Sequence, residues 1–67
     1  MKNNIAKYRN DFGISQRQLA KAVNVSDAAV AMWEKSKRSP TLKKSKEIAD
    51  FFNVSVDDIF FNQELTK

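Results

Sequence analysis

The sequence predicts an all-α fold of five short helices in a single small domain. Apolar residues recur at three- and four-residue spacing along most of the chain, which is typical of helices that bury one face. Glycine and proline occur once each in the 67 residues, so we expect short connections between the helices. A domain of this size buries only about 60% of the surface that its unfolded chain exposes, so we expect modest stability and little room for a substrate cavity.

The composition excludes several classes of function. The chain has no cysteine and no histidine, which excludes disulfides, thiolate chemistry, the common zinc sites and a histidine general base. No nucleophile, base and pocket combine in the sequence, and we expect no enzyme activity, no cofactor and no metal. No apolar run approaches the roughly 18 residues of a membrane span, so we expect a soluble cytoplasmic protein with no membrane partner.

The charge favours a polyanionic partner. The formal net charge is +4 at pH 7, and the isoelectric point is about 9.6. Nucleic acid is one such partner. The alternative is that a lysine-rich surface only keeps a small domain in solution, and the charge alone does not decide between the two.

The first helix is predicted over residues 3–12. Ile5, Tyr8 and Phe12 share one face and are expected to point inward, and Gly13 supplies a C-terminal stop. Arg9 lies one step beyond Tyr8, at the border of this buried face.

Residues 16–35 contain two short helical patterns on either side of a tight break. Ser15 can cap the first helix, and Leu19, Ala20 and Val23 follow at helical spacing. Asn24 tolerates the left-handed backbone that a helix stop needs. The small side chain of Ala20 would let two crossing helices approach closely.

The second helix of this pair is predicted to start at the Ser26 cap, with Asp27 near the positive end of its dipole. Val30 and Trp33 give it an inward stripe, so Ala28 and Lys35 should lie on the opposite face.

Two more helices are predicted after a basic loop. Thr41 can cap a helix over residues 42–52, in which Ser45 would need a buried partner such as a carbonyl one turn back. Ser55 with Asp58 three residues later marks the start of the last helix, from which Ile59 and Phe60 point inward. The expected apolar inner face of the fourth helix is Leu42, Ile48, Ala49 and Phe52.

The residues of the central pair resemble the helix-turn-helix of the Cro/CI-type phage repressor family, also called XRE-like regulators. The matching positions are Gln16, Leu19, Ala20, Asn24, Val25, Val30 and Trp33. The resemblance implies a five-helix lambda-repressor-like DNA-binding domain over residues 1–61, followed by a short polar tail over 62–67. Asn24 and Ser36 stand where the family usually has glycine.

The resemblance also implies which residues meet DNA. The base-facing positions would be Ser26, Asp27, Ala28, Ala29 and Met32. The phosphate-contacting positions would be Gln16, Arg17, Lys35, Lys37, Arg38 and Lys43. Arg9 and Glu34 would form an ion pair between the first and third helices, the alternative being two independent surface charges.

This candidate recognition face is small and largely apolar. Ala28, Ala29 and Met32 can touch thymine methyl groups, and Asp27 can accept from cytosine N4. Asp27 could instead serve only the helix end, and Met32 could instead fold onto the core. Lys43 and Lys44 oppose the dipole of the fourth helix, which indicates a nearby phosphate or a merely solvated pair.

The resemblance implies a sequence-specific transcriptional regulator that binds double-stranded DNA as a homodimer. Its expected role is a Cro-like repressor of a phage-type switch, controlled by concentration, dimerisation or another protein. The alternative is an anti-repressor that uses the same scaffold to bind another regulator. Phe61 and Leu65 could belong to a dimer contact or be ordinary exposed residues.

Overall fold

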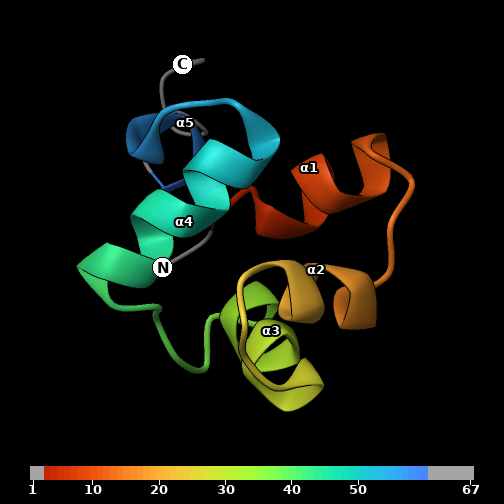
Figure 1. Cartoon of the computed structure of the whole chain (residues 1–67). Helices are drawn as coiled ribbons and strands as arrows, with labels where there is room; N and C mark the ends of the chain where they lie inside the picture. Colours follow the sequence, from red (N-terminus) through yellow and green to blue (C-terminus); the bar gives the residue numbers. More distant parts are fainter. Residues whose placement is uncertain (1–2, 61–67) are drawn as a thin grey trace.

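The computed structural model describes residues 3–60, and within that range every regular element is an α-helix. The helices are α1 (Ile5–Asp11), α2 (Gln16–Ala22), α3 (Asp27–Glu34), α4 (Leu42–Phe52) and α5 (Val56–Phe60). Figure 1 shows α2 and α3 together at one end of the molecule, with α1, α4 and α5 at the other. The predicted all-α class with five helices is confirmed, although α1 begins two residues later than expected.

Side chains cap the starts of α2, α3, α4 and α5 at the predicted positions. Ser15 accepts from the backbone N–H of Gln18, whose side chain accepts in return from the N–H of Ser15, so α2 begins with a capping box. Thr41 accepts from the N–H of Lys44 at 3.1 Å, which caps α4. A second capping box, between Ser55 and Asp58, starts α5. These caps satisfy amide donors that a helix end otherwise leaves free.

The first four helices all end in the same way. Each is followed by a residue with φ between 60° and 70°, and these residues are Gly13, Asn24, Ser36 and Asn53. The next amide then bonds back to a carbonyl five residues earlier, as Val25 does to Ala20 and Lys37 does to Met32, both at 2.9 Å. Ser36 is the strained member of the set, because a left-handed backbone costs an ordinary L-residue about 1–2 kcal/mol.

One buried cluster unites all five helices. Its members are Ile5, Leu19, Ala20, Val23, Val30, Trp33, Ile48, Ala49, Phe52 and Ile59. Ser45 is buried among them, and its hydroxyl donates to the Thr41 carbonyl at 2.8 Å, as expected for a hydroxyl in a helix interior.

Two expected core residues lie at the surface instead. Leu42 is 68% exposed, because it is the first residue of α4 and the buried face of that helix begins one turn later, at Ser45. Phe12 is 51% exposed, and its ring covers the edge of Phe52 at a centroid distance of 5.0 Å rather than entering the core. Phe61 and Leu65 lie outside the described residues. Within residues 3–60, no helix has the length and apolar character that a membrane span requires.

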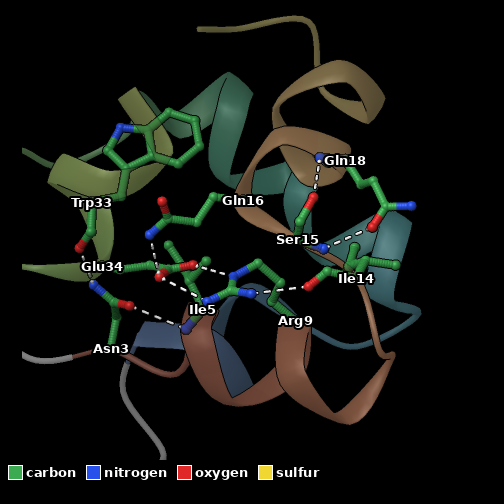
Figure 2. A network of polar contacts seen from close by, with 9 residues as sticks. All are labelled: Asn3, Ile5, Arg9, Ile14, Ser15, Gln16, Gln18, Trp33 and Glu34. Atoms are coloured by element: carbon green, nitrogen blue, oxygen red, sulfur yellow. Dashed lines mark hydrogen bonds and ion pairs between the residues drawn. The ribbon is translucent and has the colours of Figure 1, made fainter. Parts of the chain in front are cut away.

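A polar network joins α1, α2 and the end of α3 (Figure 2). The Arg9 guanidinium contacts the Glu34 carboxylate through two nitrogens, with Nε–Oε2 at 2.7 Å and Nη2–Oε1 at 3.2 Å. A third guanidinium nitrogen donates to the Ile14 carbonyl at 2.9 Å, and the Gln16 amide donates to Glu34 Oε1 at 3.0 Å. The side chains of Arg9 and Glu34 are only 16% and 8% exposed. The expected pairing of Arg9 with Glu34 is therefore present, and it is enclosed rather than solvated.

We expect Ala20→Leu to lower the melting temperature sharply. Ala20 is 1% exposed and lies in the α2–α3 pair, so a larger side chain overpacks the crossing at a cost of about 1–3 kcal/mol. The measurement is thermal unfolding followed by circular dichroism. Ala22→Leu is the matched control, because Ala22 is exposed on the same helix. Equal melting temperatures for the two variants would contradict a close packed crossing at Ala20.

We expect Glu34→Gln to destabilise the fold by about 2–3 kcal/mol, because it leaves the enclosed guanidinium of Arg9 without its counter-charge. Denaturant unfolding measures the change. Lys7→Gln is the control: it breaks the Lys7–Asp11 pair, whose side chains are 65% and 59% exposed, and should cost less than about 0.5 kcal/mol. Similar losses of unfolding free energy for both variants would show that enclosure of the Arg9–Glu34 pair does not increase its contribution to stability.

Candidate nucleic-acid interface

The orientation of α3 follows from the two side chains that it buries. Val30 is fully buried and Trp33 is 5% exposed, so the face of α3 opposite to them points to solvent. Ser26 caps this helix by accepting from the Ala29 amide at 3.1 Å. Asp27 stands in the first turn, where its negative charge complements the helix dipole.

Four of the five expected base-facing residues lie on the open side of α3. Ser26, Asp27 and Ala28 are exposed, and Met32 is 38% exposed. Ala29 differs, because it is half-buried and packs against the core. It precedes Trp33 by four residues and therefore shares the buried side of the helix. The open face is consequently made of Ala28 and Met32, with Ser26 and Asp27 at its N-terminal end.

Exposed cations follow α3 directly. Lys35, Lys37 and Arg38 are exposed, and no ion pair holds any of them within residues 3–60. The left-handed turn at Ser36 folds this segment back, so the amides of Lys37 and Arg38 both point to the Met32 carbonyl, at 2.9 and 3.4 Å. These bonds hold the backbone of the basic segment against the C-terminal end of α3.

The remaining expected phosphate-contacting residues come from α2 and α4. Arg17 and Lys43 are exposed and make no ion pair in the described part of the chain. Gln16 is half-buried, and its amide nitrogen already donates to Glu34. The Arg9–Glu34 pair thus fixes the position of the Gln16 side chain, which still has a second N–H to donate.

Lys44 does not fit the interpretation that both lysines at the start of α4 face a phosphate. Its Nζ donates to the Val23 carbonyl and to Glu47 Oε1, both at 2.8 Å. The hydrogen bond from Lys44 lowers the pKa of Glu47 below its ordinary value. Lys44 therefore links the end of α2 to α4, and its charge is balanced by Glu47 instead of opposing the dipole of α4. Lys43 is then the lysine at the start of α4 that could contact a phosphate.

A further residue, Asn3, positions α3 and was not predicted from the sequence. The Asn3 side-chain amide donates to the Trp33 carbonyl at 2.9 Å, while its oxygen accepts from the Ile5 amide at 3.0 Å. Asn3 thereby joins the start of α1 to the end of α3 across 30 positions of sequence. An asparagine just before a helix suggests a cap, but its second partner could not be found from sequence spacing.

Comparisons with known proteins identify the family. A family of proteins described as helix-turn-helix matches residues 5–59. An uncharacterised HTH-type transcriptional regulator of Methanocaldococcus jannaschii is 39% identical over 64 residues, which cover 96% of this chain and 97% of that protein. An uncharacterised HTH-type transcriptional regulator of Archaeoglobus fulgidus is 38% identical over 64 residues, covering 96% of this chain and 90% of the relative.

Two further similarities are partial. The HTH-type transcriptional activator BcrR of Enterococcus faecalis is 33% identical over 61 residues, and these cover 91% of this chain but only 30% of BcrR. The crystal structure of a transcriptional regulator from Listeria innocua superposes with a TM-score of 0.73 at 22% identity, covering 87% of this chain and 58% of that one. The structural likeness supports the fold.

The family match covers residues 5–59, which include the α2–α3 pair, and the two archaeal relatives align over nearly their whole length. The chain therefore belongs to the XRE-like helix-turn-helix family of DNA-binding transcriptional regulators.

Proposed function

We propose that the protein binds double-stranded DNA sequence-specifically as a homodimer, with α3 of each protomer in the major groove. The observation that carries this proposal is the open face of α3 followed by the exposed cations Lys35, Lys37 and Arg38, which make no ion pair among residues 3–60. Two such helices would occupy paired half-sites roughly 34 Å apart, one turn of duplex.

Base discrimination would rest mainly on shape and on few hydrogen bonds. Ala28 and Met32 offer apolar contact to thymine methyl groups, and Asp27 can accept from cytosine N4. Ser26 can bond to more than one base. Ala29 would contribute at the border of this surface, since it is half-buried.

Phosphate contacts would supply most of the affinity. The candidates are Gln16, Arg17, Lys35, Lys37, Arg38 and Lys43. With about four contacts in each protomer and eight in a dimer, log K should fall with log[salt] at a slope near −7.

As a biological role, we propose repression by occupation of promoter DNA, in the manner of the small repressor of a phage-type switch. A reporter gene with the bound site at its promoter tests this role: expression should fall when the protein is supplied. A rise in expression would reverse the proposed direction of regulation without affecting the DNA-binding proposal.

A second candidate function uses the same face for a protein partner. Ala28 and the 38% exposed Met32 form an apolar surface that another regulator could cover, and methionine adapts to irregular partners. The protein would then act as an anti-repressor. A stable complex with a co-encoded regulator, together with no preference among DNA sites, would favour this candidate.

We expect the double variant Lys35→Glu with Arg38→Glu to lose binding to its preferred DNA site at least 100-fold, because it replaces two attractions to phosphate with two repulsions in each protomer. Fluorescence anisotropy with labelled duplex, repeated at several salt concentrations, measures both the affinity and the salt slope.

The matched control is Lys7→Glu with Lys46→Glu, which makes the same change in net charge at exposed positions of α1 and α4. If the control loses as much affinity as the double variant, net charge rather than this surface governs binding, and the proposed interface is wrong.

We expect Met32→Ala to change the sequence preference of the protein and to leave its stability nearly unchanged, because Met32 is partly exposed on the open face of α3. Selection of bound duplexes from a random pool reads the preference, and thermal unfolding reads the stability. A large fall in melting temperature would place Met32 in the core instead.

A further inference from the structure

The one sulfur atom within residues 3–60 lies on the open face of α3. The chain has no cysteine and two methionines, Met1 and Met32, of which only Met32 falls among the described residues. Met32 is 38% exposed, and its side chain belongs neither to the buried cluster nor to the partly buried residues that pack against that cluster. Solvent therefore reaches the thioether, and the packing of the core does not depend on it.

Met32 joins the two parts of the candidate interface. Its side chain follows that of Ala28 by one helical turn on the open face. Its backbone carbonyl accepts from the amides of Lys37 and Arg38, at 2.9 and 3.4 Å. In the proposed DNA complex, the thioether would lie against thymine methyl groups. A change in the polarity of this side chain would therefore act directly on a proposed base contact.

Oxidation by a peroxide makes such a change. A lone pair of the Met32 sulfur attacks one oxygen of hydrogen peroxide, so that an S–O bond forms and the O–O bond breaks. The departing hydroxide takes up a proton and leaves as water, while the sulfur is oxidised and the peroxide is reduced. The product is methionine sulfoxide, which is polar and which methionine sulfoxide reductases convert back to methionine.

We propose that Met32 is a site of oxidation by hydrogen peroxide and that its sulfoxide weakens DNA binding. The second part rests on the proposed function, in which Met32 faces base edges. A thymine presents a methyl group and an acceptor in the major groove, but no donor. The sulfoxide oxygen is an acceptor, so in the complex it would lose its bound water without gaining a partner. The protein would release its DNA when peroxide accumulates and bind again after reduction.

The modification site is tested without DNA. The full chain is treated with hydrogen peroxide in the presence of free methionine, which serves as the reference for the rate, and tandem mass spectrometry locates the added oxygen. We expect Met32 to gain one oxygen atom and the melting temperature to stay nearly unchanged, because the side chain lies outside the core. The proposal is wrong if Met32 stays unmodified while free methionine is oxidised. A sharp fall in melting temperature would also overturn it, since the oxidation would then act through unfolding.

The effect on DNA binding is measured by fluorescence anisotropy with the preferred duplex. Complete oxidation should weaken binding about tenfold or more, because every complex then contains an acceptor without a donor. Treatment with both methionine sulfoxide reductases, which act on opposite epimers, should restore the affinity.

Met32→Leu is the matched control. It keeps an apolar side chain of similar volume at this position and retains Met1, so peroxide should not change its affinity. Each protein is compared with its own untreated form, and a difference in starting affinity therefore does not enter. Equal losses in the wild-type protein and in Met32→Leu would assign the effect to another residue and overturn the proposal.

Protection by DNA gives an independent measurement. Saturating duplex should slow the oxidation of Met32 several-fold relative to free methionine, and an unchanged rate would overturn its placement against the bases. Unchanged affinity after complete oxidation would overturn the regulatory part while specific DNA binding by the unmodified protein stands. If the unmodified protein prefers no DNA site, the proposed function fails and the regulatory part fails with it. The oxidation site is still decided by the experiment without DNA.

Discussion

The enclosed carboxylate of Glu34 is the contact on which the rest of the arrangement depends. It takes two hydrogen bonds from Arg9 on α1 and one from Gln16 on α2, so three helices meet at a single charged group near the end of α3. The hydrogen bond to Glu34 raises the pKa of the Arg9 guanidinium above its ordinary value. Since an enclosed charge is costly without its partner, this contact specifies one relative placement of these helices more than it adds net stability.

That placement has a direct consequence for recognition. Once Glu34, Val30 and Trp33 are fixed on the inner side of α3, the outer side must present Ala28 and Met32. The left-handed turn at Ser36 then folds the backbone of the basic segment against the C-terminal end of α3. In the proposed DNA complex, affinity and discrimination would be divided between neighbouring parts of the chain: cations outside the helix would attract the polyanion, and small apolar groups on the helix would distinguish base edges within the groove.

Most of the fold could be predicted from the sequence because its determinants are local. The caps at Ser15, Ser26 and Thr41 act within one turn, and the buried stripes follow helical spacing. The exposure of Leu42 could not be predicted, since periodicity does not reveal where the buried face of a helix begins. At the candidate site, the helical spacing of Val30 and Trp33 predicted correctly which face of α3 is buried. The bond from Lys44 to the Val23 carbonyl could not be predicted, because it depends on packing between distant segments.

The segment just before α1 links positions that are far apart in the chain, and this bears on the order of folding. Asn4 donates from its backbone to the Ile59 carbonyl at 2.7 Å and from its side chain to the Asp58 carbonyl at 2.9 Å, while Asn3 reaches Trp33. Neighbouring helices can pair early. Bringing the two ends of the domain together closes a long loop, and the entropic cost of this closure is offset only when the contacts between distant segments have formed. During synthesis, the bonds from Asn4 to Asp58 and Ile59 can therefore form only after residue 59 has left the ribosome, whereas the polar contacts of α3 with α1 and α2 all lie within the first 34 residues.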